Sequence, residues 1–186
     1  MAEVFVIATN DRASGIPMVF EAVGPDISRK AVALKANYNS ADPFPASTHP
    51  ETLGALVDTI MDRDPASLAL LERSGMGSTR QVLQRCRVYE TLAPLAADVI
   101  VLDELPASGW IHIPRDGSHW KNGFFLPERL LSSGAVIQTC CLKTHRFGGH
   151  FTLSLKNSVG LLAKTVPGSV YDFMHELHSS PFQRQM

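Results

Sequence analysis

The sequence predicts one α/β domain over residues 1–186, with a mainly parallel sheet of about five strands, flanking helices and a small inserted hairpin or lid. Two observations lead to this fold class. Short apolar runs alternate with amphipathic segments along the chain, which is typical of parallel strands joined by helical crossovers. The composition, with 45% hydrophobic and 19% charged residues, is that of a globular domain with a sizeable core.

Five short apolar runs are expected to form the strands, because each has the length of a strand and ends near turn residues. The last is long and apolar enough to run through the centre of a sheet. No closing strand follows it, so we expect the segment beyond it to lie near a sheet edge and the sheet to be incomplete at the C-terminus. The five runs span residues 4–9, 31–36, 67–71, 99–102 and 135–142.

Helices are expected between these runs. The sequence Thr48-His-Pro-Glu51 has the spacing of a capping box, with proline in the first turn. A helical stripe follows it, formed by Leu53, Leu56, Val57, Ile60 and Met61. Other helices are predicted to begin at residue 14 and at residue 152 or 154, and to lie near 80–86 and around 171–178. The inserted hairpin or lid is predicted at 110–125.

Bulk properties exclude several classes of protein. A net charge of −1 and a pI near 6.6 argue against a general nucleic-acid binder. The N-terminus has an acidic residue where a signal peptide needs positive charge, and no apolar run reaches the roughly 20 residues that span a membrane. We therefore expect a cytoplasmic protein that has no membrane partner.

Cysteine spacing indicates that no cofactor is bound by cysteines of this chain. Its three cysteines are Cys86, Cys140 and Cys141, and none of them forms a Cys-x-x-Cys pair. This spacing argues against an iron–sulfur or structural zinc site within the chain. We expect the two neighbouring cysteines to be packing residues in a buried strand.

The segment Leu142–Gly160 is the strongest candidate site. It lies within a stretch from Arg129 to Tyr171 that contains five lysines and arginines but no Asp or Glu. The other residues carry 12 basic and 18 acidic side chains, so the near-neutral total hides a basic region. Such asymmetry predicts a site for a small anionic ligand.

Residue types within this segment predict roles at the end of the fifth strand, where open α/β sheets bind ligands. Cationic groups would hold a phosphate or carboxylate, and two glycines would let the backbone approach it. His145 could be a general base or a metal ligand, and Lys156 a nucleophile or, more simply, a phosphate clamp. Alternatively, these groups only fasten a loop. The predicted ligand contacts here are Lys143, Thr144, Arg146, Gly148, Gly149 and Asn157.

A second ligand loop is predicted after the third strand, because it joins a strand to a helix. Its predicted contacts are Ser74, Gly75, Gly77, Ser78 and Thr79. No Gly-Lys-Ser/Thr follows, and a tight turn explains the loop equally well. Asn37 and His49 flank the exit of the second strand and are expected to reach the same edge.

Two histidines near the C-terminus could bind a metal. His175 and His178 are three residues apart on a predicted helix and could share an ion with His145. Solvent-facing histidines are the alternative. Trp110 and Trp120 could line a lid, although burial in a core is the default for tryptophan.

Several motifs together resemble the family called "domain of unknown function 362". They are Lys35-Ala-Asn37, Thr48-His-Pro-Glu51, Ser74-Gly-Met-Gly77, Leu142-Lys-Thr-His145, Thr152-Leu-Ser-Leu-Lys-Asn-Ser-Val-Gly160 and Met174-His-Glu-Leu-His178. The resemblance covers nearly the whole chain and implies the N-terminal portion of a longer domain. It also implies an iron–sulfur domain or partner, because family members often carry one.

A more distant resemblance is to the N-terminal region of nickel-dependent lactate racemase. It implies that His145, Gly148-Gly149 and Lys156, followed by His175 or His178, match residues that hold a nickel-containing nucleotide. The sequence is therefore interpreted as part of a cofactor- or metal-dependent isomerase or oxidoreductase that binds an anionic ligand, with a nucleotide-type or metal cofactor. The alternatives are an electron-transfer protein working with an iron–sulfur partner and a non-catalytic fragment.

Overall fold

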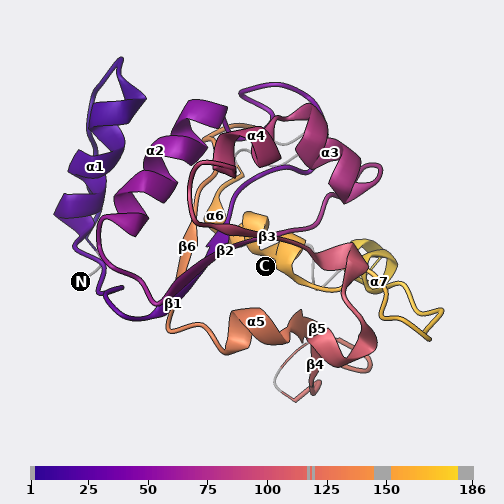
Figure 1. Ribbon diagram of the computed structural model, residues 1–186. Coiled ribbons are helices and arrows are strands. Elements are labelled where there is room, and N and C mark those ends of the chain that lie inside the picture. Colours follow the sequence, from indigo (N-terminus) through magenta and orange to yellow (C-terminus); the bar gives the residue numbers. More distant parts are fainter. Residues whose placement is uncertain (1–2, 117, 119, 145–151, 180–186) are drawn as a thin grey trace.

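A parallel sheet of four strands organises the molecule (Figure 1). Its strands lie in the order β3 (Asp98–Val101), β2 (Ser67–Glu72), β1 (Ala31–Lys35) and β6 (Ala135–Gln138). All neighbours pair in parallel, so the four carboxyl ends share one edge. The computed structural model describes residues 3–116, 118, 120–144 and 152–179. The predicted α/β class with a mainly parallel sheet is confirmed.

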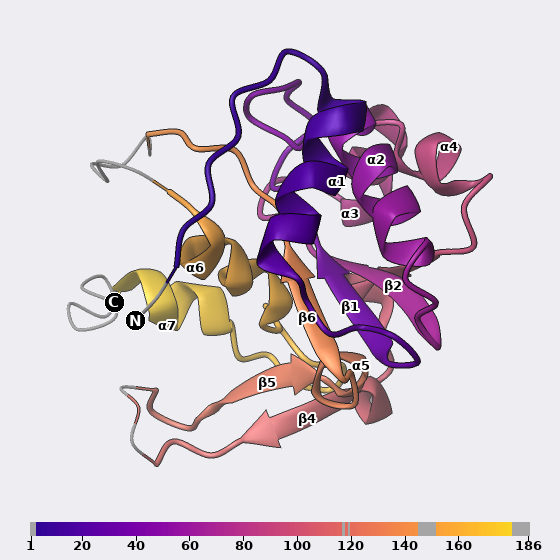
Figure 2. The ribbon, with the colours of Figure 1, turned by 90° about the vertical axis from the view of Figure 1, so that its left-hand side faces the viewer.

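Four helices cover one face of the sheet (Figures 1 and 2). Alternate strand residues such as Leu34 and Leu70 are buried against Leu53, Val57 and Ile60. Parallel sheets are buried on both faces, so their strands are apolar throughout. The helices are α1 (Arg12–Val23), α2 (Pro50–Met61), α3 (Thr79–Arg85) and α4 (Val88–Leu92).

The other face packs on a hairpin and a C-terminal helix (Figure 2). Ala33, Ala69 and Leu71 meet Trp110 and Trp120, which are both buried. The two tryptophans are thus core residues, as the default interpretation predicted. The elements on this side are β4 (Trp110–Ile113), β5 (Phe124–Pro127), α5 (Glu128–Leu131), α6 (Ser154–Asn157), the 3-10 helix η3 (Ser158–Leu161) and α7 (Phe173–Ser179). Two further 3-10 turns, η1 (Leu102–Glu104) and η2 (Ala107–Gly109), lead from β3 to β4.

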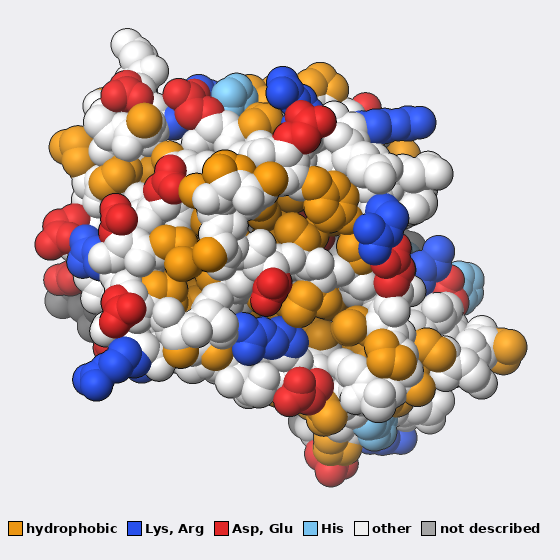
Figure 3. All heavy atoms as spheres, in the orientation of Figure 1, with side chains coloured by type: hydrophobic (Ala, Val, Ile, Leu, Met, Phe, Trp, Pro, Cys, Tyr) orange, Lys and Arg blue, Asp and Glu red, His pale blue; other side chains and the backbone are white. Residues whose placement is uncertain are grey.

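The two edge strands of the sheet, β3 and β6, are each partly exposed. β3 lies along the face seen in Figure 3, where hydrophobic side chains gather near the centre between charged groups. β6 forms the opposite edge, and Val136 is exposed there. β6 is thus an edge strand, so the expectation that residues 135–142 run through the centre of the sheet is wrong, because β1 pairs with β2 on its other side. The segment that follows β6 begins near a sheet edge, as expected.

Two strand predictions are wrong in detail. Residues 4–9 form no strand, and Val4 and Val6 are 85% and 88% exposed, because an apolar run forms a strand only where a partner offers backbone hydrogen bonds. The fifth strand ends at Gln138 rather than at residue 142. β1, its only partner among the strands of the described residues, ends at Lys35 opposite Gln138. Cys140 and Cys141 therefore lie in the following loop and are half-buried.

The predicted helix behind the capping box is α2, but its N-cap is His49 rather than Thr48. The His49 Nδ1 atom accepts a hydrogen bond from the Glu51 amide at 3.2 Å. Thr48 instead accepts from the Asn37 amide through Oγ1 at 3.0 Å. This bond ties the loop after β1 to the start of α2.

The described residues contain no helix that is both long and apolar enough to cross a membrane.

Candidate functional site at the carboxyl ends of the strands

Strand order reverses between β1 and β6. The chain builds β1, β2 and β3 outward in one direction, then returns through the hairpin and α5 to place β6 on the other side of β1. In open α/β sheets such a reversal separates two neighbouring loops and opens a crevice beyond the carboxyl ends. The loops that follow β1 and β6 therefore form the first place to look for a ligand.

A buried ion pair lies at this edge. Lys35 and Glu72 are the last residues of the two central strands, with exposed fractions of 2% and 0%. The Lys35 ammonium forms a salt bridge with Glu72 Oε1 and donates to the Ala36 carbonyl at 2.6 Å. Burial lowers the pKa of Lys35, and burial raises the pKa of Glu72 to about 6.

Part of this buried cluster is unsatisfied. Glu72 Oε2 and the Tyr38 hydroxyl are buried and have no hydrogen-bond partner among the described residues. Burial and the nearby Glu72 carboxylate raise the pKa of Tyr38. Charged and polar groups kept buried at a cost to stability are typical of functional sites. Sequence reasoning missed both members of the ion pair, although charged residues that end apolar strands are a visible signal.

The segment formed by α6 and η3, residues 154–161, lies over this ion pair and forms its cover. Asn157 Nδ2 donates to the carbonyls of Lys35 and Thr139, each at 3.4 Å. Gly160 lies so close that a Cβ atom there would be 2.7 Å from Lys35 Cε. The predicted ligand residue Asn157 therefore belongs to the structure around the ion pair.

Arg73 fastens the same segment. Its guanidinium donates to the carbonyl of Leu162 at 2.8 Å and to that of Val159 at 2.9 Å. Arg73 directly follows β2, so the α6–η3 segment is held by contacts with Lys35 at the end of β1 and with Arg73 just beyond the end of β2.

A backbone bridge joins two described residues of the basic segment. Lys143 and Thr152 form an isolated antiparallel bridge, in which the Thr152 amide donates to the Lys143 carbonyl at 2.8 Å. The Lys143 ammonium donates to the carbonyls of Pro45 and Ala46, and Asn37 Nδ2 donates to the same Ala46 oxygen at 3.2 Å. Lys143 and Asn37 thus share a backbone acceptor at the edge that Asn37 was expected to reach; their roles in ligand binding stay predictions.

Lys156 is an exposed cation in the described part of this segment. Partial desolvation of its ammonium, with the nearby Lys143 ammonium, lowers the pKa of Lys156. Thr144 is exposed. The remaining predicted residues, His145, Arg146, Gly148 and Gly149, lie outside the described residues.

The predicted loop after β2 lines a pocket. Thr79 Oγ1 accepts from the Ser74 amide at 2.8 Å and donates to Asp103 at the end of β3. The Gly75 amide donates to Asn39 Oδ1 at 3.1 Å. The pocket has a volume of about 380 Å³ and is lined by Ser74, Gly75, Gly77, Ser78, Thr79, Arg80, Val101, Asp103, Glu104 and Lys164. All five predicted loop residues line it.

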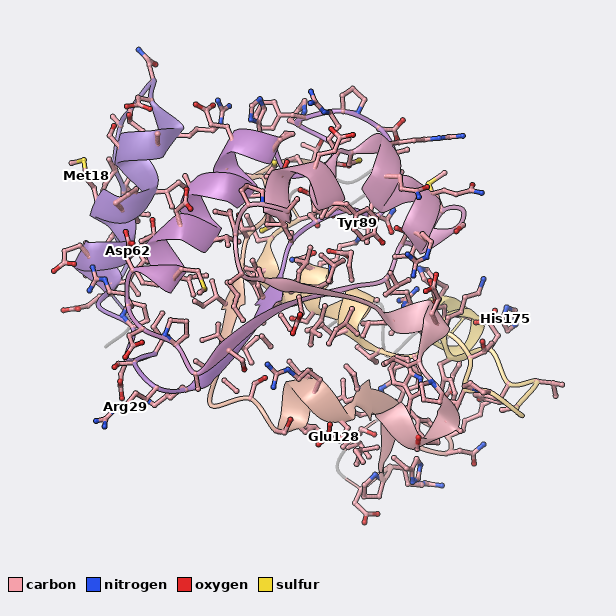
Figure 4. All side chains as sticks on the ribbon, in the orientation of Figure 1. Met18, Arg29, Asp62, Tyr89, Glu128 and His175 are labelled. Atoms are coloured by element: carbon pink, nitrogen blue, oxygen red, sulfur yellow. The ribbon has the colours of Figure 1, made fainter. Side chains whose placement is uncertain are left out.

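The two predicted metal-binding histidines lie on α7, which contacts the edge through Met174, whose Sδ accepts from Arg73 at 3.2 Å. His175 is exposed and lies at the rim of the molecule in Figure 4. His178 Nδ1 is 2.6 Å from the Met174 carbonyl within the same helix. No group of three or more His, Cys, Asp or Glu side chains that could hold a metal occurs in the described part of the chain.

One comparison with known proteins places the chain in a family. The model of the family described as "Domain of unknown function (DUF362)" matches residues 32–186. The chain belongs to this family. Neither the curated proteins nor the solved structures include a match to it.

The DUF362 match contains the whole site. It starts at Val32 in β1 and includes the four strands, the ion pair, the pocket loop and the basic segment. Only the N-terminal segment and α1 precede it. The family resemblance read from the motifs is therefore confirmed, while the resemblance to lactate racemase stays a prediction.

Proposed function

We propose that this DUF362 chain binds a small anionic molecule, phosphorylated or carboxylate, at the crevice between β1 and β6. The observation that carries the proposal is the placement of two lysines beside the reversal of strand order. Lys143 donates to the carbonyls of Pro45 and Ala46 in the loop after β1, and Lys156 is exposed on α6, shortly after the bridge that joins Lys143 to Thr152. The stretch from Arg129 to Tyr171, which carries both lysines, contains no acidic residue. A bound anion would relieve their repulsion.

The two lysines would act differently. Lys143 is tied to the loop after β1 by its contacts with backbone carbonyls, so it would supply a fixed positive field. Lys156 is exposed and would contact the ligand as a point charge. A clamp suits Lys156 better than a nucleophile, because a phosphate clamp requires only a charged, accessible ammonium. Proton transfer or metal ligation by His145, within a cofactor- or metal-dependent enzyme, completes the proposal.

Calorimetric titration with pyrophosphate, and separately with citrate, tests the site. For Lys156→Gln we expect at least fivefold weaker binding of whichever probe binds the parent protein, with a shallower dependence on salt. Lys30→Gln is the matched control, because Lys30 is also a surface lysine but precedes β1 at the opposite edge and pairs with Asp26. Equal affinities for the parent and Lys156→Gln, or no binding of either probe, would contradict the proposal.

A further inference from the structure

The pocket beyond β2 and β3 is a separate feature from the β1–β6 crevice. It lies at the carboxyl ends of the outer pair of strands, between the Ser74–Thr79 loop and the turn that begins with Leu102. None of the residues that line it belongs to the loop after β1 or to the segment 139–161. Its ligand chemistry can therefore be argued from its own side chains.

The charges that line the pocket are of both signs. Arg80 and Glu104 neutralise each other, with Arg80 Nε 2.8 Å from Glu104 Oε1 and a second contact through Nη2. Two charged side chains then remain, Lys164 and Asp103. The Lys164 side chain has no hydrogen-bond or ion-pair partner within the described residues. Asp103 accepts from the Thr79 hydroxyl, and its carboxylate also interacts electrostatically with the Arg73 guanidinium, which does not line the pocket.

This arrangement selects against a bare anion. Lys164 would attract a phosphate, but the Asp103 carboxylate in the same pocket would repel it. A ligand that brings a cation beside its anionic group satisfies both side chains. The neighbouring oxygens of Asp103 and Thr79 are hard ligands of the kind that Mg²⁺ prefers, and Mg²⁺ is usually bound by one or two carboxylates together with the phosphates of its ligand.

We propose that this pocket binds a Mg²⁺-complexed phosphate compound, with Asp103 and the Thr79 hydroxyl facing the metal ion and Lys164 holding the phosphate. Asp103 is then the residue that determines specificity. Protein oxygens alone would hold the ion weakly, so Mg²⁺ and phosphate bind together. The site is independent of the anion site proposed between β1 and β6.

Titration of the full chain with pyrophosphate, in EDTA and then in MgCl₂, tests this directly. We expect Mg²⁺ to tighten binding at least tenfold, and the amide resonances of Gly75, Gly77 and Thr79 to shift only when both components are present. Mg²⁺ alone should produce little change. A pyrophosphate affinity that is the same in EDTA and in MgCl₂ would overturn the proposal.

Variants assign the effect to the pocket. Asp103→Asn keeps an oxygen that can accept from Thr79 and should therefore fold, yet it should lose the Mg²⁺ enhancement; retention of the enhancement would overturn the proposal. Lys164→Gln should weaken binding in MgCl₂. Lys156→Gln should weaken pyrophosphate binding in EDTA but leave the Mg²⁺-dependent shifts of the Gly75, Gly77 and Thr79 amides in place, so failure of the β1–β6 site and failure of this pocket give different results. Lys30→Gln, outside both sites, should leave the Mg²⁺ enhancement unchanged. Tight binding of phosphoethanolamine in EDTA, lost in Asp103→Asn, would show instead that the pocket selects an organic ammonium group.

Discussion

Lys35 and Glu72 are paired in the interior of the protein, at the last residues of the two central strands. Both charges have left water, and within the described part of the chain only one carboxylate oxygen of Glu72 has a hydrogen-bond partner. A buried pair of this kind contributes little net stability, because desolvation of the two charges offsets their attraction. Its position at the candidate site is better explained by function than by stability.

Removal of one member of the pair should be more costly than removal of both. Lys35→Met leaves the Glu72 charge buried without its partner, which typically costs about 3–5 kcal/mol. The double variant Lys35→Met/Glu72→Leu contains no such charge and should be more stable than Lys35→Met. Urea denaturation of the parent and both variants measures this order. A double variant less stable than Lys35→Met would show that the pair itself holds the fold together.

Glu72 should lose its proton at a higher pH than an ordinary glutamate. Burial raises the pKa of Glu72 from 4.5 to about 6, so between these pH values the folded protein holds a proton that the unfolded chain has lost. The contribution of Glu72 to stability therefore decreases as the pH rises through this window. The carboxyl carbon shift of Glu72, followed by NMR, gives the pKa directly. Because the Lys35 ammonium opposes the rise, the midpoint should move higher still in Lys35→Met; a midpoint below 4.5 in the parent would refute the assignment.

Gly160 should not tolerate a side chain. An alanine Cβ there would lie 2.7 Å from Lys35 Cε and 3.0 Å from Lys35 Nζ, which forces the cover away from the ion pair. We expect Gly160→Ala to lose about 1–3 kcal/mol. Gly54→Ala, within α2, is the control. A Cβ at Gly54 would meet only Thr91 Cγ2, at 3.6 Å, so this substitution should be neutral or stabilising. Thermal denaturation of both variants compares them, and equal melting temperatures would argue against close packing at Gly160.

Arg73 should resist replacement even by lysine. Its guanidinium spans the carbonyls of Leu162 and Val159, whereas a lysine ammonium is a single point of contact. Arg73→Lys should therefore lose about 1.5–3 kcal/mol and expose the amides of η3 to faster hydrogen exchange. Arg85→Lys changes an exposed arginine in α3 and should have no effect. Unchanged exchange in η3 of Arg73→Lys would mean that the cover is held by other contacts.

The parts of the fold predicted well are those set by local patterns. The stripe from Leu53 to Met61 specifies α2, and the runs at 67–71 and 99–102 specify β2 and β3 almost to the residue. Residues 4–9 show the limit of such patterns, because they are as apolar as a strand but have no partner. The end of β6 is likewise set by β1 rather than by its own sequence.

The same distinction between local and long-range signals explains why only part of the candidate site was predicted. Glycines and hydroxyls between a strand and a helix mark the Ser74–Thr79 loop locally, and all five predicted residues line the pocket. Asp103 and Lys164 join that pocket from distant parts of the chain, and no local pattern connects them with the loop. The ion pair was missed because the partners are 37 residues apart in sequence, and only the register of β1 on β2 brings them together.

Asn157 lies 122 residues along the chain from Lys35, whose carbonyl it contacts. Contacts between such distant residues require closure of a long loop and form slowly during folding. The cover over the ion pair can be completed only after β6 has paired with β1, because Asn157 also binds the Thr139 carbonyl just beyond β6. The candidate site is therefore assembled at the end of folding, and a chain that has built only its first three strands already contains both charges but has nothing to enclose them.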